Sequence, residues 1–255
     1  MFEGKRVLVT GGSGLLGMAL VTRFRSLGVK VTSACFRHYP SVIYPDVEYI
    51  QGDLTDEQMC DKETKGKDYV FHCAAVIAGA AGMDKGKVDL ITPNIKINMS
   101  LLKAAYKVGI KKFVFFGSTT SYPDTGSRPV REDEAFNGDP YDKYFDVGWM
   151  KRYGEKLCES YTRKGMPCVV LRPSNMYGPH DRFDPLISHV TAALIKKVVD
   201  RQDPLEVWGD GSEMRDLIYV DDMADACVLA LEKINTYDPI NIGAGGCHSV
   251  NDILS

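Results

Sequence analysis

The sequence has no long apolar run, little net charge and no closely spaced cysteine pair. No stretch approaches the ~20 consecutive apolar residues of a membrane-spanning helix, and the first residues, Met-Phe-Glu-Gly-Lys-Arg, carry no apolar signal segment. The 31 basic and 34 acidic residues nearly cancel, which argues against a dedicated nucleic-acid binder. The seven cysteines lack a C-x-x-C pattern, so reduced thiols are expected rather than disulfides or metal ligands. We therefore expect a soluble cytoplasmic protein with no membrane or nucleic-acid partner.

Short β-branched runs alternate with helical stretches up to Leu171. This rhythm predicts an α/β protein with a Rossmann-like, doubly wound parallel sheet that carries helices on both faces. The expected strands cover residues 6–10, 29–36, 47–50, 69–72, 112–116 and 168–171, and the expected helices cover 14–27, 94–108 and 147–163.

Prolines and glycines interrupt the chain after Leu171 and predict a small lobe built on the main sheet. A short strand is expected at 205–208, while a helix at 221–231 and a strand at 239–242 return to the main sheet. The predicted domains are residues 1–172, with returning elements at about 221–243, and a substrate-binding lobe mainly within 173–255.

The last residues carry the signal of a helix that is beginning. Ser249 and Asp252 have the spacing of a capping box, yet the sequence stops about one turn later, at Ser255. Because so short a helix is not stable alone, we expect the lobe to be truncated at its C-terminus.

Three glycines between the first expected strand and its helix form a candidate phosphate-binding turn. One glycine permits the tight turn, a second lets the backbone approach a pyrophosphate, and the last lets the helix pack on the strand. The pyrophosphate then meets free N–H groups at the positive end of the helix. The turn predicts a dinucleotide site whose candidate contacts are Gly11, Ser13, Gly14, Leu15, Leu16 and Gly17.

The end of the second expected strand bears on the choice of cofactor. NAD enzymes usually place an acidic residue there, whereas NADP enzymes accommodate the 2′-phosphate with an arginine. Residues 33–38 read SACFRH, so Arg37 is present and an acid is absent. NADP(H) is therefore favoured, with NAD(H) as the alternative. Asp53, which Leu54 follows, comes after the third strand, where a carboxylate can accept a hydrogen bond from the adenine amino group.

Several motifs follow one another along the whole chain: TGGSGLLG at 10–17, GDLTD at 52–56, HCAA at 72–75, Asn98, RPSNMYGPHDRF at 172–183 and VWGDG at 207–211. Together they resemble the extended short-chain dehydrogenase/reductases, the NAD-dependent epimerase/dehydratase family. Within that family the likeness is greatest to the GDP-L-fucose synthases. The resemblance implies an NADP(H)-dependent oxidoreductase that reduces a GDP-linked 4-keto-6-deoxy sugar, with Ala74, Ala75 and Lys151 also at the cofactor.

The resemblance also implies a catalytic set of Ser/Thr, Tyr and Lys. Ser118 matches the hydroxyl that polarises the carbonyl, and Lys151 matches the lysine that holds the nicotinamide ribose. The tyrosine that would protonate the sugar oxygen belongs four residues before Lys151, but that position holds Val147. Tyr144, about two helical turns before the lysine, is one candidate substitute, and Tyr141 or a bound water is a weaker one.

A second departure from the family pattern concerns epimerisation. The synthases that the chain resembles use a cysteine as base and a histidine as acid at the sugar carbons. Thr120 stands at the cysteine position and His180 at the histidine position. Because a threonine hydroxyl is too weakly acidic to serve as that base, the sequence argues against 3,5-epimerisation. The resemblance implies substrate contacts from Asn175, His180, Trp208 and Arg215, with the arginine facing the diphosphate.

Two alternative functions remain open at this point. One is an NAD-dependent nucleotide-sugar 4-epimerase or dehydratase, and the other is a catalytically impaired relative that binds cofactor or sugar nucleotide, because Val147 replaces the tyrosine. The resemblance further implies a homodimer that forms through the helix at 94–108 and the helix that carries Lys151.

Overall fold

The computed structural model describes residues 4–77, 89–126, 128–184, 187–207 and 209–255, and its core is a seven-stranded sheet. All neighbouring strands of this sheet run parallel, in the order β3-β2-β1-β4-β5-β6-β9. The expected parallel α/β fold is confirmed. The strands are β1 (Arg6–Thr10), β2 (Lys30–Cys35), β3 (Glu48–Gln51), β4 (Tyr69–His72), β5 (Lys112–Phe116), β6 (Cys168–Pro173) and β9 (Ile240–Ile242).

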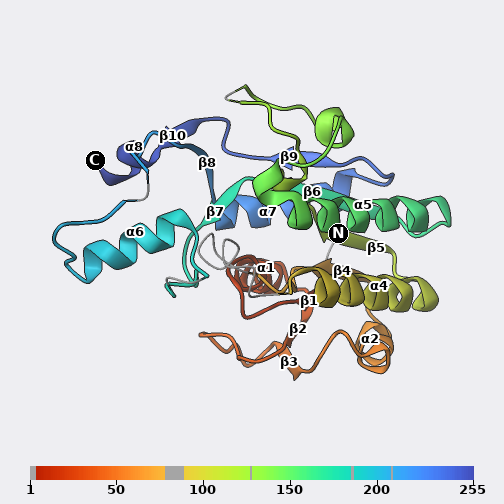
Figure 1. Ribbon diagram of the computed structural model, residues 1–255. Coiled ribbons are helices and arrows are strands. Elements are labelled where there is room, and N and C mark those ends of the chain that lie inside the picture. Colours follow the sequence, from red (N-terminus) through yellow and green to blue (C-terminus); the bar gives the residue numbers. More distant parts are fainter. Residues whose placement is uncertain (1–3, 78–88, 127, 185–186, 208) are drawn as a thin grey trace.

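Helices cover both faces of the sheet (Figure 1), and each face has its own apolar core. Along β1 the side chains alternate, so Val7 and Val9 enter one core while Leu8 enters the other. The first core is closed by α1 (Leu15–Ser26) and α7 (Val220–Lys233). The second core is closed by α2 (Glu57–Thr64), α4 (Ile91–Val108) and α5 (Phe145–Arg163).

A second, smaller sheet stands at one end of the main sheet, at the upper left of Figure 1. Its strands are β7 (Asn175–Tyr177), β8 (Met214–Tyr219) and β10 (Cys247–Ser249), in the order β10-β8-β7. Beside it lie α6 (Val190–Val199) and α8 (Val250–Leu254). Between β8 and β10 the chain returns to the main sheet through α7 and β9. The proposed boundary at residue 172 stays a prediction, because two sheets in one chain are not in themselves two folding units.

Two local expectations have opposite outcomes. The short strand expected at 205–208 is wrong for residues 205–207, and Trp208 lies outside the described residues. The carbonyl of Glu206 accepts a hydrogen bond from Lys197 Nζ at 2.6 Å instead of from a neighbouring strand. The capping box before α8 is confirmed, since Ser249 Oγ accepts from Asp252 N at 3.0 Å and Asp252 Oδ2 accepts from Ser249 N at 2.8 Å. Within the described residues, no helix has the length and apolarity needed to cross a membrane.

A buried ion pair joins α5 to β6. The side chains of Glu155 and Arg172 are 0% and 1% exposed, and Arg172 donates through Nε and Nη2 to the two carboxylate oxygens at 2.9 and 2.7 Å. Nη1 of the arginine donates to the hydroxyl of Tyr122 and to the carbonyl of Glu132, both at 2.9 Å. Burial alone lowers the pKa of Arg172, but its bonds to Glu155 outweigh burial and hold that pKa above its ordinary value.

The ion pair lies directly beneath the turn that follows β5, residues 117–122. A Cβ on Gly117 would stand 2.5 Å from Glu155 Oε1, so only a glycine lets the turn lie this close. At the far end of the turn, the Tyr122 hydroxyl donates to Asn241 Oδ1 at 2.5 Å. Between them, Arg152 Nε donates to the carbonyl of Ser121 at 2.8 Å. The turn is therefore held along its whole length.

Breaking this ion pair should destabilise the fold strongly. Glu155→Ala leaves the Arg172 guanidinium buried without its counter-charge, and we expect the free energy of unfolding to fall by about 3–5 kcal/mol. Glu57→Ala is the matched control, because Glu57 pairs with Lys103 on the surface, with both side chains more than 60% exposed, and removing it should cost about 1 kcal/mol or less. Urea unfolding measures both values, and equal losses would contradict the assignment.

Candidate functional site

The glycine turn between β1 and α1 forms a cradle for a phosphate group. Gly11 has a φ of +67°, and a Cβ there would stand 2.7 Å from the backbone nitrogen of Ala74. A Cβ on Gly17 would overlap the carbonyl oxygen of Gly11, so α1 packs directly on the turn. The N-cap residue Gly14 provides no side-chain cap. The first N–H groups of α1 thus stay open to an anion, which fits a pyrophosphate.

The residues at the ends of β2 and β3 form the edge at which the sequence predicts the contacts to the adenosine half of a dinucleotide. Arg37 is exposed, and its guanidinium stands 5.4 Å from the ring centroid of Phe36. The carbonyl of Phe36 accepts from Gln51 Nε2 at 2.9 Å, which joins the ends of the two strands. Asp53 is exposed and its Oδ1 accepts from Thr55 N at 2.9 Å. Leu54 is 6% exposed and anchors this corner in the core.

A buried histidine fixes the next strand end. Burial lowers the pKa of His72 to about 4, so its ring is neutral. The ring lies 2.8 Å from Asn98 Oδ1 through Nε2 and 2.9 Å from Thr10 Oγ1 through Nδ1. Because the amide oxygen can only accept, Nε2 carries the proton and Thr10 donates to Nδ1. Thr10 in turn accepts from the N–H of Ala74 at 3.2 Å, which sets Ala74 and the exposed Ala75 beside the glycine turn.

Lys151 lies at the carboxyl end of β5. Its Nζ donates to the carbonyl of Phe116 at 2.8 Å and stands 5.5 Å from the ring centroid of Phe115. Burial lowers the pKa of Lys151 to about 8, although the charge of Glu155, one helical turn further on, acts in the opposite direction. A lysine with this pKa is still largely protonated at neutral pH and is able to give up its proton.

Ser118 begins the short 3-10 turn 119–121 and serves as its N-cap. Its Oγ accepts from the backbone N–H of Thr120 at 3.1 Å and from the hydroxyl of Thr120 at 2.9 Å. The carbonyl oxygen of Thr120 lies 2.5 Å from the place that a Cβ on Gly148 would take. The turn that carries both hydroxyls therefore rests on the first turn of α5.

Tyr144, the candidate substitute for the missing tyrosine, makes its contacts away from Ser118 and Lys151. Val147 is half-buried on α5, one turn before Lys151. Tyr144 precedes α5 as its N-cap residue, and its ring packs edge-on against Tyr141, with centroids 5.9 Å apart. In the described part of the chain, no hydrogen bond or ring contact joins Tyr144 to Ser118 or Lys151. The catalytic roles of these residues stay predictions.

The candidate substrate residues lie on and beside the small sheet. Asn175 on β7 donates through Nδ2 to the carbonyl of Asp216 at 3.4 Å, and Arg215 on β8 donates to the carbonyl of Met214 at 2.8 Å. His180 follows β7 with a φ of +69° and is exposed, and its Nδ1 lies 2.7 Å from Ser41 Oγ. The connection between β2 and β3 thus reaches the segment that follows β7.

Sequence reasoning missed the residues that hold the site together. Ser41 is separated from His180 by 139 positions, and no local pattern links the two. Asp216 accepts from Ser174 Oγ at 3.0 Å and from Ala244 N at 2.9 Å, which ties β8 to the ends of β6 and β9. The sequence offered one signal for the buried ion pair. Arg172 lies at the end of the buried strand β6, and a buried arginine needs a buried acid as its partner, here Glu155.

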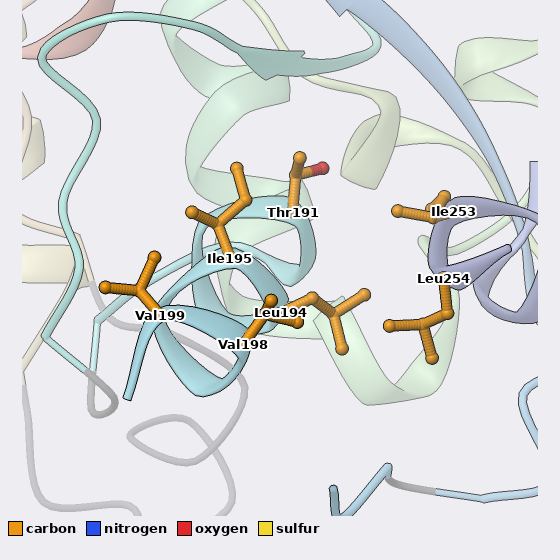
Figure 2. Close-up of a pocket in the computed structure, with 7 residues that line it drawn as sticks. All are labelled: Thr191, Leu194, Ile195, Val198, Val199, Ile253 and Leu254. Atoms are coloured by element: carbon orange, nitrogen blue, oxygen red, sulfur yellow. The ribbon is translucent and has the colours of Figure 1, made fainter. Parts of the chain in front are cut away.

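An apolar groove between α6 and α8 lies apart from this chemistry (Figure 2). Its single polar side chain is that of Thr191, so it offers neither an acid nor a base. We therefore place the site at the carboxyl ends of the strands and not in this groove. The lining residues are Thr191, Leu194, Ile195, Val198, Val199, Ile253 and Leu254.

Comparison with known proteins agrees with this geometry. Residues 7–243 match the model of the NAD dependent epimerase/dehydratase family. A GDP-L-fucose synthase of Sinorhizobium fredii is 31% identical, over 99% of this chain and 79% of the relative. GDP-mannose 3,5-epimerase 1 of Oryza sativa subsp. japonica is 29% identical, over 98% of this chain and 67% of the relative. The crystal structure of a UDP-glucose 4-epimerase from Thermotoga maritima, with UDP-glucose, has a TM-score of 0.85 at 28% identity, covering 97% of this chain and 80% of that chain.

The lowered pKa of Lys151 should make stability depend on pH. Between about pH 8 and the ordinary lysine value of 10.5, the unfolded chain binds more protons at this residue than the folded chain does, so the free energy of unfolding rises with pH. Lys151→Met removes this contribution. We expect urea unfolding to show the native chain gaining stability relative to the variant from pH 8 to pH 10, and a constant difference would contradict the burial of the charged amine.

Proposed function

The chain belongs to the NAD dependent epimerase/dehydratase family, and we propose that it is an NADP(H)-dependent oxidoreductase of the GDP-L-fucose synthase type. Its substrate would be a GDP-linked 4-keto-6-deoxy sugar. The observation that carries the proposal is the meeting of two features at one edge of the sheet. The glycine turn with its open helix end lies there, after β1. Ser118 follows β5, which is separated from β1 by β4, and Lys151 of α5 reaches the end of β5 through the carbonyl of Phe116.

Each residue of this edge would have its own role in carbonyl reduction. A reduced nicotinamide supplies the hydride when it is bound. The first turn of α1 binds the pyrophosphate, Lys151 holds the nicotinamide ribose, and Ser118 donates a hydrogen bond to the carbonyl oxygen. The reaction also consumes one proton, which Val147 cannot donate. Lys151, with its pKa of about 8, carries a suitable proton, and Tyr144 is the other candidate.

The small sheet and its loops would bind the sugar nucleotide. Arg215 is the residue proposed for the diphosphate, because a guanidinium bonds phosphate oxygens in pairs. Asn175 and His180 are proposed for the sugar, together with Trp208. Since Thr120 takes the place of the cysteine base, we propose that the enzyme reduces its substrate without 3,5-epimerisation.

Exposed apolar side chains support a homodimer. On α5, Phe145, Trp149 and Tyr153 recur every four residues and are each more than 40% exposed, and Met99 and Tyr106 on the adjacent α4 are similarly exposed. We propose that this paired surface of α4 and α5 meets its counterpart in a second copy. Light scattering that gives a monomer mass at micromolar concentration would contradict this.

The second candidate function is a non-catalytic binding protein. Its specific support is Val147, which cannot donate the proton that the tyrosine would supply. Such a protein would bind NADPH and GDP and leave the keto sugar unchanged. A 4-epimerase or dehydratase that keeps NAD bound is the third possibility, and Arg37 in place of an acid argues against it.

The direct test is to incubate the purified chain with NADPH and GDP-4-keto-6-deoxymannose while following absorbance at the nicotinamide band. We expect NADPH consumption and a product with unchanged configuration at the sugar's third and fifth carbons. Ligand binding without consumption would favour the binding protein, and a Val147→Tyr variant that gains turnover would then identify the missing proton donor as the cause. An epimerised product would contradict the role given to Thr120.

Arg37 should decide between the two nicotinamide cofactors. Its guanidinium is the charged donor at the end of β2, so Arg37→Ala should weaken NADPH binding by about 10- to 100-fold, as expected for a charge-assisted hydrogen bond. NADH lacks the 2′-phosphate, so its dissociation constant should change little and provides the internal control. Fluorescence titration measures both constants, and equal weakening of the two cofactors would rule out phosphate recognition by Arg37.

A further inference from the structure

We propose that Thr120 is a positioning residue that turns the hydroxyl proton of Ser118 outward, toward the carbonyl oxygen of the substrate. The proposal rests on the carbonyl reduction proposed above and gives this threonine a role other than that of an epimerisation base.

The argument starts from the hydrogen-bonding capacity of a serine hydroxyl, which has one proton to donate and two lone pairs to accept with. Both lone pairs of Ser118 Oγ are engaged by the same residue. The backbone N–H of Thr120 donates to it at 3.1 Å and the hydroxyl of Thr120 donates to it at 2.9 Å. The Ser118 proton is therefore left free to donate away from Thr120.

Lys151, which reaches the end of the same strand, cannot accept that proton. The ammonium group of Lys151 has only donors, and it is turned to the carbonyl of Phe116 at 2.8 Å. Within the described residues Ser118 Oγ accepts two hydrogen bonds and donates none, so an oxygen brought by the substrate can accept its proton. A carbonyl oxygen that becomes an alkoxide during hydride transfer fits this demand.

Accepting two hydrogen bonds also makes the serine a stronger donor, because hydrogen bonds in a chain polarise one another. This matters more here than in a site with a tyrosine. Val147 offers no hydroxyl, so Ser118 is the hydroxyl of the Ser, Tyr and Lys set that is left to bond the carbonyl oxygen. Thr120 compensates in part for the missing phenol by directing and strengthening the donor that remains.

The turn is rigid enough to keep Thr120 in this role. Gly117 lies on the buried carboxylate of Glu155, and the carbonyl of Thr120 lies against Gly148 of α5. Arg152 holds the carbonyl of Ser121 at 2.8 Å. With the backbone fixed on both sides, the geometry between Thr120 and Ser118 is set before substrate arrives, as preorganised stabilisation requires.

The direction of the hydrogen bond can be measured in the protein without any ligand. Neutron diffraction from a deuterium-exchanged crystal places the deuterium of each hydroxyl. We expect one deuterium on Thr120 Oγ1 along the line to Ser118 Oγ, and the deuterium of Ser118 pointing away from Thr120. A deuterium on Ser118 directed at Thr120 Oγ1 would overturn the proposal, whatever the activity of the chain.

Variants test the consequence for catalysis. Thr120→Val keeps the shape and removes the hydroxyl, and we expect kcat for the keto sugar to fall about tenfold, with KM little changed, because the bond acts on the developing alkoxide. Thr120→Ser keeps the hydroxyl and should retain near-native kcat. Ser118→Ala should lose about 100-fold or more, as for other oxyanion donors.

The outcomes separate this inference from the proposed function. If the native chain does not reduce the keto sugar, the proposed function fails, while the neutron result still decides the direction of the bond. If the native chain is active and Thr120→Val has the same kcat, the positioning role is wrong. Unfolding curves of both Thr120 variants identify any loss that comes from stability, and a fall in kcat shared equally by Thr120→Ser would also reject the hydroxyl as its cause.

Discussion

The buried pair of Glu155 and Arg172 is the constraint on which the rest of the site depends. Each charge alone would pay a large desolvation penalty in the core, so the two must stay together with their hydrogen bonds complete. Completing them brings together α5, β6 and the hydroxyl of Tyr122, and through that hydroxyl Asn241 of β9. The turn 117–122 lies on this network, and it carries the serine to which we assign the hydrogen bond to the carbonyl.

Glycines then decide how closely α5 approaches the sheet. A Cβ on Gly154 would overlap the ring of Phe115, and one on Gly148 would overlap Pro140. Because both positions lack side chains, the helix lies close enough for Lys151 to reach the carbonyl of Phe116. The same helix thus supplies Glu155 to hold the turn and Lys151 to face the cofactor edge, one helical turn apart. The depth of burial that lowers the pKa of Lys151 follows from this close packing.

The parts of the molecule that follow from local pattern were predictable from sequence, and those that depend on distant partners were not. The glycine turn, the strands around it and the capping box at Ser249 each depend on neighbouring residues, and the structure has them. The strand expected at 205–207 failed because a strand needs a partner, and here the carbonyl of Glu206 bonds a lysine instead. The contact between Ser41 and His180 and the pairing of Glu155 with Arg172 arise only when the chain has folded.

The valine at position 147 changes what the remaining groups must do. In a site with serine, tyrosine and lysine, two hydroxyls share the carbonyl oxygen and the lysine only tunes one of them. Here Ser118 is the one hydroxyl of that set that remains. Both of its lone pairs accept hydrogen bonds from Thr120. The half-buried lysine has its pKa lowered to about 8 by desolvation, closer to the pH at which an amine transfers protons efficiently. The bond from the backbone of Thr120 also caps the turn 119–121, so it serves the fold as well as the proposed donor. A serine donor and a lysine of lowered pKa at one edge of the sheet are what the proposed reductase needs in place of the missing tyrosine.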